Sequence, residues 1–169
     1  NETSKDKQML EILSLGAGVQ SSALLLMSLY GVLPKLDYVI FADTGWEPTA
    51  VYTHLEKLEK ECEKYKVPLI RVKYKEDSNI STDPFRTDKP SRTTDMPMFV
   101  KKDDGKAGMI QRRCTGTYKV KPINKMLYVI MKETGITSIN QWIGISYDEL
   151  NRMKKHSDSK INNKYHLVD

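Results

Sequence analysis

Small and hydroxyl-bearing residues gather in one segment of the sequence, SLGAGVQSS, which covers residues 14–22. Apolar runs on both sides indicate that the chain turns here from a strand into a helix. Backbone N–H groups at such a turn, together with the helix dipole, bind phosphate. The glycines would let the backbone approach an anion, and the serines could cap the helix and donate to phosphate oxygens. The residues expected to hold the ligand are Ser14, Gly16, Ala17, Gly18, Gln20, Ser21 and Ser22.

This segment matches neither of the two common glycine-rich nucleotide loops. No Gly-Lys-Ser/Thr follows, as a Walker loop requires, and the glycine spacing is not that of GxGxxG. A turn with a purely structural role is therefore the alternative to phosphate binding.

A second candidate is Asp43-Thr44-Gly45, which directly follows the apolar run 37–42. In open α/β sheets, ligands bind at the carboxyl ends of the strands. Asp43 could accept a hydrogen bond from a ribose hydroxyl or an adenine amine, or bind Mg²⁺. The alternative is a plain helix cap.

Positive charge is concentrated between residues 86 and 125, where eleven Lys and Arg face four Asp, in a chain with a net charge of +5. This basic segment indicates an anionic partner: phosphate, sulfate, a nucleic-acid backbone or the acidic face of a thiol-redox partner. A solvated loop rich in lysine is the alternative. Arg112 and Arg113 favour phosphate because guanidinium groups match its geometry.

The arginine pair is followed by Cys114, whose thiolate the neighbouring cations would favour. Cys114 could act as a nucleophile or cluster ligand, with Arg113 and Lys119 as catalytic cations, or it could be a structural thiol. We expect Arg112, Arg113, Lys119 and Lys121 to converge on one anion. A further apolar run leads into a charged turn that contributes Gly144, Ser146 and Arg152 to the same site.

The elements that position these residues alternate between strand and helix. Apolar runs predict strands at 9–15, 37–42, 68–74, 139–146 and, more weakly, 165–168, while helical spacing predicts helices at 21–30, 48–65 and 121–134. This alternation predicts an α/β fold with a parallel sheet sandwiched by helices. We expect one domain at 9–169, a disordered start at 1–8, and a long basic lid loop at 76–113 that prolines interrupt.

The composition is that of an ordinary globular protein, with 39% hydrophobic and 29% charged residues. No apolar run is long enough for a membrane span, and the polar start is no signal peptide, which predicts a cytoplasmic protein without membrane contact. Two cysteines are too few for a disulfide framework, and Cys62 lies on an apolar helical stripe, where we expect it to pack. The three scattered histidines indicate no metal site. Nothing in the sequence excludes a homo-oligomer.

Four segments in order, LSLGAGVQSSAL, FADTGW, CTGTYKVKPI and WIGISYDELNR, resemble the phosphoadenylylsulfate (PAPS) reductase family of the PP-loop adenine-nucleotide α-hydrolase-like superfamily. Phage and bacterial PAPS-reductase-like proteins are the most similar. The resemblance implies that residues 14–22 replace the modified P-loop and that Asp43 and Gly45 lie under the nucleotide. It also implies that Lys119 and Pro122 match the KVxP element, and Gly144 and Arg152 a second anion-binding turn. The implied ligand is ATP, AMP or PAPS.

The sequence also departs from that family. The loop reads GAGVQSS rather than SGGxDS, so Gln20 stands near the place of an aspartate. The ECGxH-like segment with the catalytic cysteine of sulfonucleotide reductases is missing, which suggests a fragment or a shortened relative. Cys114 is followed by Thr115 rather than a second cysteine, so no iron–sulfur cluster is expected in this chain alone. The resemblance implies an enzyme that acts on a sulfonucleotide or cleaves or adenylates with ATP. The alternative is a nucleotide-binding module, a sensor or sequestering protein associated with nucleic acid, that has lost catalysis.

Overall fold

Five parallel strands form the central sheet of the computed structural model, in the order β3-β2-β1-β6-β7. The structure describes residues 9–83, 99–101, 105, 107–109 and 115–168. In chain order the elements are β1 (Leu10–Leu15), α1 (Val19–Leu29), β2 (Tyr38–Ala42), α2 (Thr49–Lys64), β3 (Leu69–Val72), β4 (Phe99–Lys101), β5 (Ala107–Met109), the π-helix η2 (Thr115–Val120), α3 (Lys121–Thr134), β6 (Ile139–Ile143), the 3₁₀ helix η3 (Tyr147–Arg152) and β7 (Ile161–Lys164).

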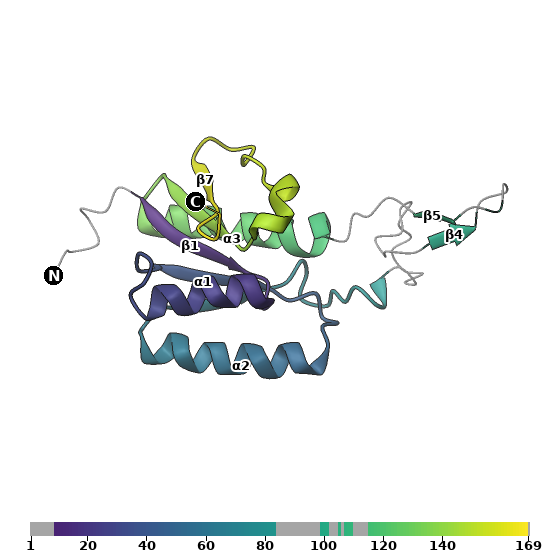
Figure 1. Ribbon diagram of the computed structural model, residues 1–169, viewed down its shortest axis with the longest axis horizontal. Coiled ribbons are helices and arrows are strands. Elements are labelled where there is room, and N and C mark those ends of the chain that lie inside the picture. Colours follow the sequence, from purple (N-terminus) through teal and green to yellow (C-terminus); the bar gives the residue numbers. More distant parts are fainter. Residues whose placement is uncertain (1–8, 84–98, 102–104, 106, 110–114, 169) are drawn as a thin grey trace.

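Helices cover both faces of this sheet, α1 and α2 on one side and α3 on the other (Figure 1). Successive residues of a strand point to opposite faces, so Leu13 and Leu15 pack toward α1 and α2, while Ile12 packs toward α3. Apolar residues at helical spacing supply the covering surfaces, including Leu55 and Leu58 of α2. The predicted parallel sheet with helices on both faces is thereby confirmed.

The strand order reverses direction between β1 and β6. From β1 the chain proceeds to β2 and β3 on one side, and it returns to β6 and β7 on the other. Ser14 pairs with Ile40 on one side and with Ile143 on the other, so the strands end close together. Such a reversal separates the loops that follow two neighbouring strands and is the usual place for a ligand in open α/β sheets.

The prediction of a last strand at 165–168 was wrong. Residues 165–168 form a turn, in which Val168 N donates to Tyr165 O at 2.9 Å, and the fifth strand is β7. Its sequence, INNK, has a single buried apolar residue, Ile161. β7 lies at the edge of the sheet, where it pairs with β6 on one side only. An edge strand of this kind lacks the apolar pattern that marked the others.

Two further expectations differ from the structure. Helix α1 begins at Val19 with Gly18 as its N-cap, so Ser21 and Ser22 lie within the first turn and cap nothing. Within the segment 76–113, predicted to be irregular, β4 and β5 pair as an antiparallel hairpin. Gly105, between these strands, has φ +79, a conformation that favours glycine. Closure as a lid stays a prediction, and residues 1–8 lie outside the described part.

Candidate functional site

The loop after β1 is held in place by a serine of the following helix. Gly16 N donates to Ser21 Oγ at 3.1 Å, and Ser21 Oγ donates to Gly18 O at 3.3 Å. Ala17 has φ +53, a conformation that adds to the tight bend. A Cβ placed on Gly18 would have no heavy atom within 4 Å. The fold therefore leaves open space beside the α-carbon of Gly18, at the position that a Cβ would take.

The loop after β6 touches the start of α1. A Cβ on Gly144 would lie 2.7 Å from Ser21 N, so only glycine fits at this position. Gln20 Nε2 donates to Ser146 Oγ at 2.8 Å and to Glu149 Oε2 at 3.0 Å. The predicted residues of the first and last segments thus meet at the point where the strand order reverses.

The turn after β2 holds the carboxylate of Asp43 firmly. Its Oδ1 accepts hydrogen bonds from Gly45 N and from Tyr52 OH, both at 2.8 Å, and its Oδ2 lies 3.8 Å from Lys73 Nζ. Burial raises the pKa of Tyr52; its hydrogen bond to Asp43 and the nearby carboxylates of Asp43 and Glu47 add to this, while the Glu47 backbone N–H opposes it. The phenol therefore stays protonated and donates to Asp43.

Gly45 makes the turn possible. It has φ +77, and a Cβ there would lie 2.9 Å from Ser78 O, so the backbone of residues 78–79 packs directly on the glycine. Asn79 Nδ2 donates to Gly45 O at 2.8 Å and fixes that approach. The first residues of the predicted lid, up to residue 83, are thus part of the wall of this turn.

Lys119 reaches the same turn from η2. Its Nζ lies 3.1 Å from Glu47 Oε1, which also accepts a hydrogen bond from the buried Thr44 hydroxyl at 3.1 Å. Trp46, between Thr44 and Glu47 in the chain, leaves 63% of its surface exposed. Lys119, from the predicted segment at 114–123, therefore contacts the turn after β2. The contact is made through the carboxylate of Glu47, which the sequence analysis did not single out.

Ser22 and Ser14, like Ser21 and Ser146, have partners within the fold. Ser22 Oγ lies 2.9 Å from His54 Nε2, which links the first turn of α1 to α2. Ser14 Oγ accepts a hydrogen bond from Gln141 Nε2 at 2.7 Å, within the sheet. Both side chains thus stabilise the base of the loop in this structure.

The expected convergence of cations is described only in part. Lys119 pairs with Glu47, Arg152 pairs with Glu149 of η3, and Lys121 Nζ lies 5.8 Å from the centre of the Tyr74 ring. Arg112, Arg113 and Cys114 lie outside the described residues. Of the three described cations that were expected at the site, Lys119 and Arg152 each pair with a carboxylate of the protein.

Sequence reasoning missed four residues that shape this site: Glu47, Tyr52, His54 and Glu149. Glu47 and Tyr52 follow Asp43 at four and nine positions, but Asp43 and Glu47 lie in a turn and Tyr52 in α2, so no single strand or helix period relates the three. Only Glu149, three residues before Arg152 on a short helix, had a local signal, because an acid and a base three apart can pair.

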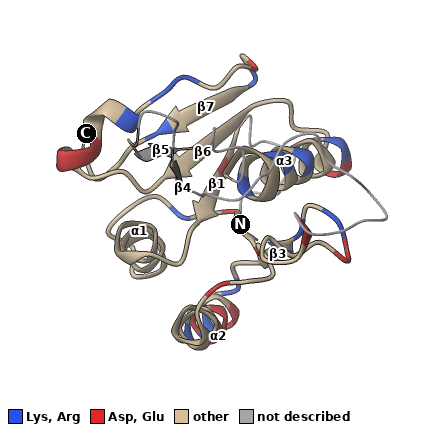
Figure 2. Ribbon diagram, turned by 90° about the vertical axis from the view of Figure 1, so that its right-hand side faces the viewer, with Lys and Arg blue, Asp and Glu red and all other residues tan. Residues whose placement is uncertain are grey.

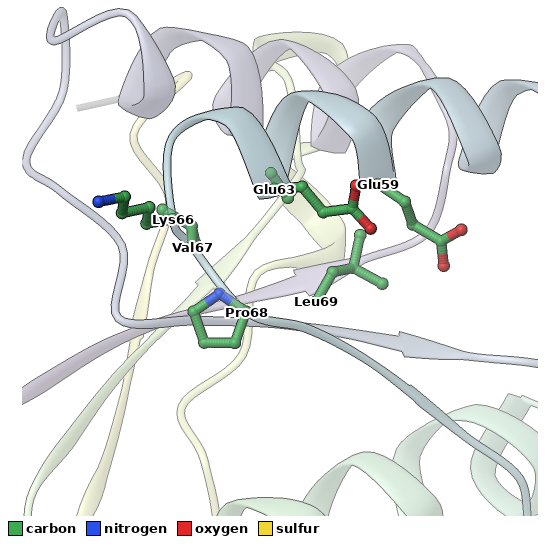
Figure 3. Close-up of a pocket in the computed structure, with 7 residues that line it drawn as sticks. Glu59, Glu63, Lys66, Val67, Pro68 and Leu69 are labelled. Atoms are coloured by element: carbon green, nitrogen blue, oxygen red, sulfur yellow. The ribbon is translucent and has the colours of Figure 1, made fainter.

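A pocket also exists at the opposite edge of the sheet, where α2 ends and β3 begins (Figure 3). Its lining consists of Glu59, Cys62, Glu63, Lys66, Val67, Pro68 and Leu69. Cys62 is buried, as predicted, and burial next to three glutamates raises its pKa to about 11. At neutral pH it remains a thiol and is no nucleophile.

No family model matches the chain, and neither do any curated protein or solved structure. Among the described residues, no group of three His, Cys, Asp or Glu side chains could hold a metal ion. No helix in the described part is long and apolar enough to cross a membrane.

Proposed function

We propose that this chain binds an adenine nucleotide at the carboxyl edge of its sheet and belongs among the PAPS-reductase-like proteins of the PP-loop adenine-nucleotide α-hydrolase-like fold. One observation carries the proposal. The glycine loop after β1 and the turn after β6 meet where the strand order reverses, through Gly144 against Ser21 and Gln20 against Ser146. A loop that opens a helix at this place has N–H groups directed at an anion.

The neighbouring turn supports a nucleoside rather than a bare anion. Asp43 is fixed by Gly45 and Tyr52, and its second oxygen is paired only loosely, with Lys73 at 3.8 Å. A fixed carboxylate one strand away from a phosphate loop suits a ribose hydroxyl or an adenine amine. Trp46, which is mostly exposed on this turn, offers an aromatic face for a base.

For the reaction, we favour chemistry on a sulfonucleotide or on ATP. The loop at 16–18 would bind phosphates, while Arg112, Arg113, Lys119 and Arg152 would neutralise a sulfate or second phosphate. Cys114 would be the nucleophile. Cationic groups act in this way where negative charge accumulates during group transfer.

Titration calorimetry with ATP, AMP, adenosine phosphosulfate and PAPS tests the binding step. We expect micromolar binding of at least one of them, and Gly18→Val should abolish it. Because a Cβ at Gly18 meets nothing in the fold, the variant should keep the melting temperature of the parent. Lys60→Val, on an exposed part of α2, is the matched control and should bind normally. Unchanged binding by Gly18→Val would show that the loop does not hold the nucleotide.

A second function, a nucleotide-binding module without catalysis, is favoured by the paired cations. Lys119 and Arg152 each have a carboxylate partner, so neither is held free for a transition state. Release of pyrophosphate from ATP, or of sulfite from a sulfonucleotide with a thiol reductant, separates the two functions. Tight binding with no release of either product would support the module.

A further inference from the structure

A second cavity lies between the segment 153–160 and β7. It has a volume of about 580 Å³, and its lining includes Lys154, Lys155, His156, Asp158, Ser159 and Asn163. We call it the β7 pocket. The segment 153–160 runs from the end of η3 to the start of β7 at the edge of the sheet (Figure 1). No residue of this pocket belongs to the proposed nucleotide site.

The segment around the β7 pocket is strongly basic. Between residues 153 and 164 the sequence has four Lys against a single acid, Asp158. Figure 2 shows Lys and Arg along this segment and on β7. Lys154, Lys155 and Lys160 are exposed, and within the described residues none of them forms an ion pair. This differs from the carboxyl edge, where Lys119 and Arg152 are paired.

The single acid is already engaged. Asp158 accepts hydrogen bonds from Tyr128 OH at 2.7 Å and from Lys160 N at 2.9 Å. These bonds, the one from the Lys160 backbone first, lower the pKa of Asp158, so its charge is fixed and directed at α3. It does not neutralise Lys154 or Lys155.

The lysines are carried by an ordered backbone. Tyr165 OH donates to Lys154 O at 2.6 Å and accepts from Lys154 N at 2.9 Å, while Asn163 Nδ2 donates to the same carbonyl at 2.7 Å. A segment anchored in this way loses little conformational entropy when it binds a ligand.

Two polar side chains of the pocket, His156 and Asn163, can form hydrogen bonds with a ligand in fixed directions. His156 Nδ1 accepts a hydrogen bond from Asp158 N at 3.0 Å, so the neutral ring carries its proton on Nε2 and can donate it. Asn163 uses Nδ2 for Lys154 O, and its Oδ1 is buried with no hydrogen-bond partner among the described residues. Buried polar atoms are nearly always satisfied by a protein group, a water or a ligand, so this oxygen is able to accept a hydrogen bond from a ligand in the pocket.

The geometry points to a single-stranded nucleic acid as that ligand. Its phosphates match Lys154, Lys155 and the Nε2–H of His156, and an amino or hydroxyl group of a base or sugar matches Asn163 Oδ1. Lys160 and Lys164 stand at the two ends of β7, ~13 Å apart along the strand, so the lysines of this segment extend beyond the reach of one phosphate. A polynucleotide lying along them would approach η3 and the rim of the proposed nucleotide site.

Fluorescence anisotropy with a labelled 20-nucleotide single strand tests this inference. The parent should bind, and Lys154→Ala/Lys155→Ala should lose at least about tenfold in affinity at low salt. The loss of two phosphate contacts should also make the negative slope of log K against log salt shallower by roughly 1.4. The matched control is Lys57→Ala/Lys60→Ala, two exposed lysines of α2, which should bind like the parent.

Three results would overturn the inference: no binding by the parent, an equal loss in both double variants, or full displacement of the strand by inorganic phosphate or AMP at equal phosphate concentration. The last result would assign the pocket to a small anion. The proposed nucleotide site is tested separately, because Lys154→Ala/Lys155→Ala should keep the parent's affinity for ATP, and Gly18→Val should keep its affinity for the strand.

Discussion

The two edges of the sheet are built in different ways. At the carboxyl edge, hydrogen bonds join loops far apart in sequence: Gln20 contacts Ser146, and Asn79 contacts Gly45. At the amino edge, the pocket beside Cys62 is lined by one continuous stretch, 59–69. The pocket beside Cys62 is therefore not a place where polar groups from separate loops converge. In open α/β sheets, ligands bind at the carboxyl ends of the strands, so the carboxyl edge is where we expect a composite site.

The largest effect should come from filling the glycine contact at the carboxyl edge. In Gly144→Ala the new Cβ would lie 2.7 Å from Ser21 N, a backbone atom that cannot turn away. We expect a loss of about 1–3 kcal/mol in the free energy of unfolding, measured by urea denaturation, and a loss of nucleotide binding.

Gly116→Ala is the control for this change, because a Cβ there meets nothing within 4 Å. It should leave stability nearly unchanged. If Gly144→Ala were as stable as the parent, the two loops would not be packed together, and the contrast between the edges would disappear.

At the amino edge, the next effect depends on pH. Burial, followed by the charges of Glu59, Glu61 and Glu63, raises the pKa of Cys62 from 9.0 to about 11. A group whose pKa is raised on folding contributes stability that is complete below its unfolded pKa and is lost as pH rises through its folded pKa. The contribution of Cys62 should therefore be lost between pH 9 and about 11.

Urea midpoints at pH 8, 9, 10 and 11 measure this loss. The decline between pH 9 and 11 should be smaller in Cys62→Ala than in the parent, whatever the absolute stability of the variant. Equal declines would mean that the thiol is not buried at the amino edge as described.

Much of the fold can be predicted from the sequence because the spacing of apolar residues along a helix or strand is a local signal. The spacing in α2 and α3 predicted both helices nearly to the residue, and the apolar runs predicted β1 and β2. The edge strand β7 has little apolar surface, so the prediction fell four residues too late. The site was predicted less completely. Ser22 against His54 is a tertiary contact that no spacing encodes.

A smaller effect should follow from loosening the carboxylate of the β2 turn. Tyr52→Phe removes the hydroxyl that donates to Asp43 and accepts from Glu47 N at 3.3 Å. We expect a loss of about 1 kcal/mol in unfolding free energy, the usual contribution of such a hydrogen bond.

Nucleotide binding should weaken in Tyr52→Phe as well, because Asp43 would be free to turn. Tyr30→Phe, whose exposed hydroxyl has no hydrogen-bond partner among the described residues, should change neither stability nor binding. A stable Tyr52→Phe variant with full affinity would remove Asp43 from the proposed site.

The smallest effect should be a gain in nucleotide affinity from a substitution at the carboxyl edge, which can be compared directly with the same substitution at the amino edge. Glu149 pairs with Arg152 and accepts from Gln20 at the start of α1, where we propose that an anion binds. Glu149→Gln removes a charge that would repel this anion and releases Arg152 to bind it. Two unit charges about 5 Å apart in water repel by roughly 0.8 kcal/mol, so affinity should rise about fourfold.

The gain should be larger for PAPS than for AMP, because PAPS has more negative charge, and stability should change little, since exposed ion pairs contribute little. Glu59→Gln is the matched change at the amino edge, where Glu59 holds Arg71 through two hydrogen bonds of 2.6 Å. It should leave nucleotide affinity as in the parent. Equal gains from both substitutions would reflect only the change in net charge, and no gain from Glu149→Gln would mean that the bound anion lies elsewhere. A gain confined to Glu149→Gln would mean that the Glu149 carboxylate lies beside the anion site and weakens the binding of the ligand there.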